Sequence, residues 1–139
     1  MNILSEFILN NWFLLVCFLI VAVCYLATFM GASSGVSVQE AVGIINSETI
    51  VILDTRGEKL FNEGHISGAM LLSNSEIDSL SNEILKYKEK TVLVYCESGL
   101  SSGSFVKKLE EKGFGRVKYI KGGLVSWRQE NYPIETGVV

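Results

Sequence analysis

The most restrictive feature of this 139-residue sequence is an uncharged, apolar run of 19 residues from Trp12 to Met30. A helix of this length rises about 1.5 Å per residue and is close to 30 Å long, the thickness of a bilayer's hydrocarbon core. Aromatic residues stand near both ends of the run, at Trp12, Tyr25 and Phe29, as is typical of membrane interfaces. The run therefore predicts one transmembrane helix, at about residues 10–30, that contacts membrane lipid.

Three other interpretations agree less well with the sequence of this segment. A buried core helix would need apolar partners around its whole circumference, and nothing else in the chain could supply them. A cleaved signal peptide would need a basic region before the run, and residues 1–11 contain no Lys or Arg. A lipoprotein site at Cys24 would need a smaller residue than Val23 before it.

Composition changes after residue 30. Residues 1–30 hold 24 hydrophobic residues and one charge, Glu6, whereas the rest carries 12 basic and 14 acidic residues, a formal charge of 12 − 14 = −2. This mildly acidic part excludes a nucleic-acid binder with a basic face. Its roughly 105 residues suffice for one domain with one core. We expect an N-terminal segment at 1–30, a Gly/Ser/Ala linker at 31–35 and a single domain at 36–139.

Orientation follows from the tail and the cysteines. The N-terminal tail is short, and every basic residue lies C-terminal to the run, which favours an outside N-terminus and a cytoplasmic domain. Three cysteines do not make a disulfide framework, which agrees with a reducing compartment. Two of them, Cys17 and Cys24, lie seven residues apart on one face of the predicted transmembrane helix.

After residue 36, helix and strand patterns alternate. Ser37 and Glu40 form a capping-box pattern at the start of the first helix. The patterns predict helices at 37–46, 75–87, 102–112 and from 123, and a short helix or turn at 57–63. They predict strands at 50–53, 70–72, 91–95 and 116–120. The alternation predicts a doubly wound α/β domain whose mostly parallel sheet is flanked by helices. Such sheets bind ligands at the carboxyl ends of their strands.

One cysteine, Cys96, follows the strand at 91–95 and is the only cysteine after residue 30. The loop between it and the next helix consists of Glu97, Ser98, Gly99, Leu100, Ser101 and Ser102. Small and hydroxyl residues let such a loop turn its N–H groups inward as an anion cradle at a helix N-terminus, which lowers a thiol pKa. The pattern predicts a nucleophilic cysteine, with a buried strand-end cysteine as the alternative.

The same loop resembles the active-site loop of the rhodanese sulfurtransferases, Cys-x-x-Gly-x-x-Ser. Three further segments resemble motifs of that family in the same order along the chain. They are Asp54-Thr55-Arg56, then Gly64-His65-Ile66-Ser67-Gly68-Ala69, then Gly122-Gly123 with Trp127 and Tyr132-Pro133. The resemblance runs from about Val36 to Gly137 and is greatest to membrane-anchored, single-domain bacterial members.

The resemblance implies a sulfurtransferase of the bacterial inner membrane. Cys96 would take sulfane sulfur from a donor such as thiosulfate as a persulfide, and pass it to cyanide or a thiol. Loop amides would stabilise the persulfide, and no metal or organic cofactor is implied. Structural roles are implied for four motif residues: Asp54, Arg56, His65 and Trp127.

One departure from the family pattern concerns charge. Many members carry Arg where this chain has Ser101, and the loop here holds Glu97 and no cation. We therefore expect weak affinity for free thiosulfate unless Lys121, Arg128 or a partner supplies a positive charge. A second hypothesis is a catalytically idle rhodanese module that binds a membrane protein. A dual-specificity phosphatase would need a longer loop with a phosphate-clamping Arg, and this loop has neither.

Overall fold

The computed structural model describes residues 2–30 and 34–137, with the side chains of residues 27–30 excepted. The chain divides into two compact units, Met1–Ser33 and Ser34–Val139. Within the predicted linker, residues 31–33 lie outside the described residues. Gly35, also placed in that linker, lies in strand β1 (Gly35–Val36) of the second unit.

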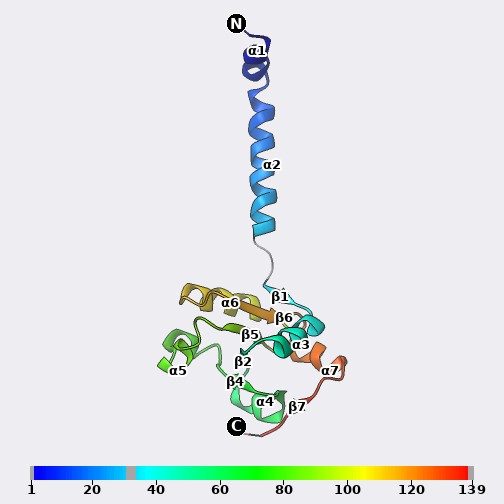
Figure 1. Cartoon of the computed structure of the whole chain (residues 1–139), viewed down its shortest axis with the longest axis vertical. Helices are drawn as coiled ribbons and strands as arrows, with labels where there is room; N and C mark the ends of the chain where they lie inside the picture. Colours follow the sequence, from blue (N-terminus) through cyan, green and yellow to red (C-terminus); the bar gives the residue numbers. More distant parts are fainter. Residues whose placement is uncertain (1, 31–33, 138–139) are drawn as a thin grey trace. The chain divides into compact units, whose positions relative to one another are not determined.

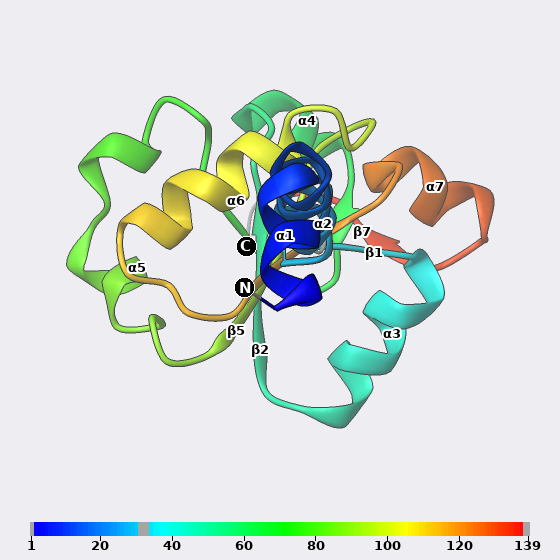
Figure 2. The same cartoon turned by 90° about the horizontal axis from the view of Figure 1, so that it is seen from above.

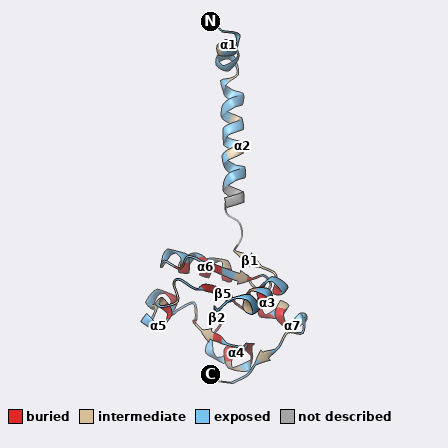
Figure 3. Cartoon of the chain, viewed as in Figure 1, coloured by how far each residue is buried: buried red, intermediate tan, exposed pale blue. Residues whose placement is uncertain are grey.

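The first unit consists of α1 (Ile3–Asn10) and α2 (Trp12–Met30), which the predicted transmembrane segment overlaps. Their described side chains are mostly exposed (Figure 3). Within the described residues, no helix alone has both the length and the hydropathy of a membrane span. Ile3–Asn10 and Trp12–Leu26 meet the requirement together, by length and composition, as a pair bent by 69°. The predicted aromatic position at Phe29 lies outside the described side chains.

The second unit is built on a five-stranded sheet in the order β1-β6-β5-β2-β4, and every pairing in it is parallel (Figure 1). Besides β1, its strands are β2 (Ile50–Asp54), β4 (Ala69–Leu71), β5 (Thr91–Tyr95) and β6 (Val117–Ile120). Strand β5 is central, lies between β2 and β6, and is buried along its whole length. The predicted α/β class with a mostly parallel sheet is confirmed.

Helices cover both faces of this sheet (Figure 2). Short helix α5 (Asn82–Leu85) and α6 (Ser102–Glu111) lie on one side, and α3 (Val38–Ser47) and α7 (Gly123–Gln129) on the other. The capping box predicted for α3 is confirmed, because Ser37 Oγ accepts from Glu40 N–H at 3.2 Å while Glu40 Oε2 accepts from Ser37 N–H at 2.7 Å.

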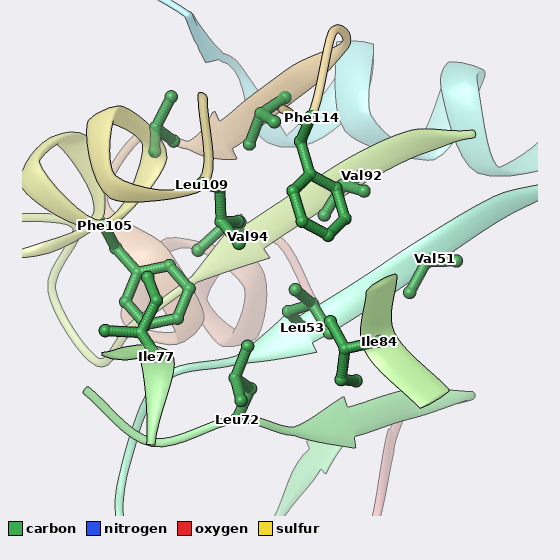
Figure 4. Close-up of a cluster of buried hydrophobic side chains, with 12 residues drawn as sticks. Val51, Leu53, Leu72, Ile77, Ile84, Val92, Val94, Phe105, Leu109 and Phe114 are labelled. Carbon is green, nitrogen blue, oxygen red and sulfur yellow. The ribbon is translucent and has the colours of Figure 1, made fainter. Parts of the chain in front are cut away.

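Two hydrophobic clusters fill the layers between sheet and helices. Alternate residues of a strand point to opposite faces, so neighbouring residues of β5 serve different clusters. Val92 and Val94 pack with Phe105 and Leu109 of α6 (Figure 4), whereas Leu93 packs with residues of α3 and α7 on the other face. This double burial fixes the central strand on both sides and holds its carboxyl end in place.

The prediction of one continuous helix at 75–87 was wrong. The structure has a 3₁₀ turn at Ile77–Ser79 and then α5, separated by an extended backbone at Leu80 and Ser81. The segment is rich in Ser, Asp and Asn, whose side chains favour turns and caps over helix interiors. Ile77 and Ile84 still reach one hydrophobic cluster, which explains the helix-like spacing.

Three elements of the second unit had no counterpart among the predictions. They are β1 and the antiparallel pair β3 (His65–Ile66) and β7 (Ile134–Glu135), each only two residues long. Helix α4 (Glu58–Glu63) occupies the segment 57–63, where a short helix or turn was predicted, and it leads into β3. The β3–β7 pair ties the segment after α4 to the end of the domain.

Candidate active site

Cys96 lies directly after β5, so its sulfur is held at the carboxyl end of the central strand. The side chain is buried, and its Sγ accepts a hydrogen bond from the backbone N–H of Gly99 at 3.0 Å. Gly99 has φ +82°, and a Cβ there would lie 2.7 Å from the backbone N of Gly122. The loop therefore needs glycine at this position in order to curl around the sulfur.

The pKa of the Cys96 thiol is lowered from its ordinary value of 9.0. Burial acts in the opposite direction, but the hydroxyls of Ser101 and Ser102 and the backbone N–H groups of Ser101 and Gly99, all directed at the thiolate charge, outweigh it. Ser102 Oγ is buried and makes no hydrogen bond of regular geometry within residues 34–137, so the hydroxyl is available to the sulfur. The arrangement favours the thiolate, which is the nucleophilic form.

The N-terminus of α7 supports the backbone of this loop. Leu124 N–H donates to the carbonyl of Cys96 at 2.9 Å, and Val125 N–H donates to the carbonyl of Glu97 at 3.0 Å. Gly123 approaches so closely, with φ +58°, that an added Cβ would overlap the carbonyl oxygen of Cys96. The Gly122-Gly123 motif thus fixes the loop through close backbone contact rather than through side-chain chemistry.

A buried charge network borders the loop on the side of β2. Arg56 binds the carboxylate of Asp54 through Nε and Nη2, at 3.0 and 2.7 Å, and also donates to the carbonyl of Gly64. Its Nη1 donates to Glu97 Oε2 at 2.8 Å. Burial acts to lower the pKa of Arg56, but the bonds to Asp54 and Glu97 dominate and raise it. Arg56 therefore links the Asp-x-Arg motif to the cysteine loop.

Tyr95, the last residue of β5, completes this network. Its hydroxyl donates to Asp54 Oδ2 at 2.7 Å and accepts from the N–H of Ile66 at 3.1 Å. Burial and the adjacent Asp54 carboxylate raise the pKa of Tyr95 well above its ordinary value of 10.0. Sequence reasoning missed Tyr95, although a hydroxyl at the end of an apolar strand is a usable signal.

His65 and Trp127 are not brought to the sulfur. His65 is fully buried, stacks on Phe61, and its Nδ1 is 2.8 Å from the Phe61 carbonyl oxygen. Trp127 Nε1 donates to the carbonyl of Pro133 at 3.0 Å. Within residues 34–137, neither side chain is hydrogen-bonded to Cys96 or to its loop.

The cations suggested as substitutes for the missing loop Arg lie elsewhere. The charge of Lys121 acts on Glu40, and the guanidinium of Arg128 packs against Gly64. A cation that does contact the loop is Arg56, for which a structural role was expected, and its pairing with Glu97 follows from the adjacency of β2 and β5. Among residues 2–30 and 34–137, no group of three or more His, Cys, Asp or Glu side chains could hold a metal ion.

The loop residues differ in exposure. Ser102 is fully buried at the start of α6, whereas the side chain of Leu100 is 91% exposed at the loop tip. Ser101 occupies the N-cap position of α6 without a side-chain cap bond. The loop thus combines a polar cradle around the sulfur with an apolar outer residue.

Comparison with known proteins agrees with this geometry. A family model described as a rhodanese-like domain matches residues 37–130. The uncharacterized protein YibN of Escherichia coli K12 is 37% identical over 123 residues, covering 86% of this chain and 85% of its own. Thiosulfate sulfurtransferase GlpE of Coxiella burnetii is 38% identical over 89 residues, covering 64% of this chain and 81% of its own.

Solved structures show the same fold. The BH2092 protein of Bacillus halodurans matches with a TM-score of 0.65 at 26% identity, over 81% of this chain and 84% of its own. A rhodanese-like domain of the Anabaena protein Alr3790 matches with a TM-score of 0.57 at 31% identity, over 63% of this chain and 99% of its own. From its sequence match, its parallel sheet and the loop that follows β5, the chain belongs to the rhodanese-like domain family.

Proposed function

We propose that the protein is a sulfurtransferase that carries sulfane sulfur as a persulfide on Cys96. The observation that carries this proposal is the environment of the sulfur. Gly99 N–H lies 3.0 Å from Sγ, and the surrounding loop lowers the thiol pKa. A cradle of backbone donors that stabilises a thiolate also stabilises the anion of a persulfide.

The proposed reaction has two displacement steps. The Cys96 thiolate attacks the outer sulfur of thiosulfate, the bond between its two sulfur atoms breaks, and sulfite leaves with the electron pair. An acceptor thiolate or cyanide then attacks the outer sulfur of the persulfide. The Cys96–sulfur bond breaks, its electron pair returns to Cys96 as the thiolate, and the acceptor carries the sulfur away. Neither step needs an oxidant, and we propose that no metal or organic cofactor takes part.

The relatives support this proposal to different degrees. GlpE of Coxiella burnetii and of Tolumonas auensis are named thiosulfate sulfurtransferases, at 38% and 31% identity. YibN, which covers more of this chain, has no named activity. Sulfur transfer is therefore the activity with named precedent among these relatives.

Intact-mass measurement tests the proposal. The full-length chain in detergent is incubated with thiosulfate or polysulfide, desalted and weighed. We expect the gain of one sulfur atom, located on Cys96 by peptide mapping and lost on addition of cyanide. The Cys96→Ser variant keeps Cys17 and Cys24 and serves as the control. No gain in the wild type with either donor, or an equal gain in Cys96→Ser, would refute the proposal.

We also propose that residues 10–30 anchor the protein in the bacterial inner membrane, with the N-terminus outside and the domain in the cytoplasm. The composition of the α1–α2 pair supports this anchor. Protease added to intact spheroplasts tests the orientation. The domain should resist digestion until the membrane is broken, and digestion in intact spheroplasts would reverse the assignment.

A second candidate is a catalytically idle module that binds a membrane protein. The 91% exposure of Leu100 beside the cradle favours a docking role for the loop. Co-purification of a membrane partner that is unaffected by Cys96→Ser, together with no persulfide in the wild type, would favour this function over sulfur transfer.

A further inference from the structure

The charge balance beside the cradle bears on which sulfur compounds the site takes. Asp54, Arg56 and Glu97 form one hydrogen-bonded group with two formal negative charges and one positive charge. The Arg56 side chain is only 4% exposed, and Asp54 is fully buried, so their charges are compensated inside the protein. The Glu97 side chain is 45% exposed, so its carboxylate is the member that a substrate in solution meets.

We propose that Glu97 is a specificity-determining residue that slows sulfur exchange with negatively charged sulfur compounds, so that the site exchanges sulfur preferentially with organic thiols and persulfides whose remaining groups are uncharged or cationic. This inference rests on the proposed sulfur transfer through Cys96. The cradle amides act at hydrogen-bond distance on the reacting sulfur, whereas Glu97 acts on the charges carried by the rest of the substrate.

Two features of the loop agree with this selection. Arg56 carries one positive charge and is bonded to both Asp54 and Glu97, so the three groups together still present one net negative charge to an incoming anion. The exposed side chain of Leu100 offers apolar contact to the carbon chain of an organic thiol. A small inorganic dianion gains nothing from that contact and is repelled by the net charge.

The test compares three small thiols as acceptors of the Cys96 persulfide: anionic 3-mercaptopropionate, uncharged 2-mercaptoethanol and cationic cysteamine. Full-length protein in detergent is loaded with excess polysulfide and desalted. The rate at which Cys96 loses one sulfur atom, without gaining a thiol adduct, is followed by intact mass. The ratio of variant to wild-type rate is taken for each thiol, because the ratio cancels intrinsic differences in thiol reactivity.

For Glu97→Gln, which keeps the shape of the side chain, this ratio should be largest for 3-mercaptopropionate and smallest for cysteamine. All three thiols react as thiolates and differ only in the charge at the other end of the molecule. Relative to the ratio for 2-mercaptoethanol, the ratio for 3-mercaptopropionate should be about threefold to tenfold higher and the ratio for cysteamine about threefold to tenfold lower at low salt. Glu111→Gln is the matched control, because it removes the same charge at the far end of α6, about 13 Å along the helix from Ser102. It should leave the three ratios equal.

The salt dependence of the wild-type rates tests the same charge effect without a variant that could misfold. Raising the salt from about 10 mM to about 1 M shortens the Debye length from about 30 Å to about 3 Å. Relative to the rate with 2-mercaptoethanol, the rate with 3-mercaptopropionate should rise and that with cysteamine should fall. Equal ratios for the three thiols in Glu97→Gln, or relative wild-type rates that do not depend on salt, would overturn the selectivity while leaving sulfur transfer intact. A wild type that never loads sulfur would overturn both.

Discussion

Replacing Tyr95 with Phe deletes one buried oxygen atom from the network behind the cysteine loop. The Tyr95 hydroxyl is fully buried, donates to the Asp54 carboxylate at 2.7 Å and accepts from Ile66 N–H at 3.1 Å. In the variant, Asp54 keeps its bonds to Arg56, but the Ile66 N–H is left buried without this acceptor. The substitution therefore removes one hydrogen bond to a charged group and leaves one donor unpaired.

The magnitude follows from those two losses. A hydrogen bond to a charged group contributes about 1.5–3 kcal/mol, and an unpaired buried N–H costs about 1–3 kcal/mol. Some relaxation offsets the sum, so we expect Tyr95→Phe to lower the free energy of unfolding by about 3 kcal/mol. This is a large part of the stability of a small domain.

The assay is urea unfolding of the full-length chain in detergent, followed by brief proteolysis of the unfolded fraction. Tyr132→Phe is the control. Within the described part of the chain the Tyr132 hydroxyl makes no hydrogen bond, and the phenyl ring of the variant still packs on Trp127. The control should stay within about 0.5 kcal/mol of the wild type. A Tyr95→Phe variant as stable as the control would refute the role given to the network.

The pH dependence of stability provides a second test of the Tyr95 network. The pKa of Tyr95 is raised in the folded protein, so its contribution is fully present below the ordinary pKa of 10.0 and is lost as pH rises above it. Wild-type stability should therefore fall at alkaline pH, and the difference from Tyr95→Phe should shrink. A difference that grows above pH 10 would contradict the assignment.

Further predictions concern the cysteine loop. Because the pKa of Cys96 is lowered, the pH dependence of its alkylation rate should have a midpoint below 9.0. Ser102→Ala should move that midpoint upward. An unchanged midpoint would show that the Ser102 hydroxyl does not stabilise the thiolate. Gly123→Ala should cost about 2 kcal/mol or more and abolish persulfide formation, because its Cβ overlaps the Cys96 carbonyl. Gly103→Ala is the matched control, because a Cβ added at this position in α6 has no neighbouring atom within 4 Å. This variant should stabilise the protein by about 0.5–1 kcal/mol. Equal denaturation midpoints for the two variants would contradict the close approach of α7.

The long apolar strands of the domain are visible in the sequence because a fully buried strand excludes polar residues. Ile50–Asp54 and Thr91–Tyr95 were both placed correctly, and β5 brought Cys96 to the predicted edge of the sheet. The two-residue strands β3 and β7 carry no periodicity of their own. They form because the core brings two segments that are far apart in the sequence side by side.

The sequence pattern did not predict which side chains on different loops would bond to one another. The sequence places Arg56 and Glu97 after adjacent strands, yet it does not specify that one guanidinium serves Asp54, Glu97 and Gly64 together. That choice depends on rotamers and on burial, which a linear pattern does not encode. The lowered pKa of Cys96 was expected from loop composition and agrees with the structure.

The contact between α7 and the cysteine loop also sets when the site can exist during synthesis. The carbonyls of Cys96 and Glu97 receive their N–H partners from Leu124 and Val125, more than twenty residues downstream. A nascent chain that has emerged only as far as α6 has the thiol but not the groups that hold its loop. The supported conformation of the cysteine loop is thus one of the last features that the domain acquires during synthesis.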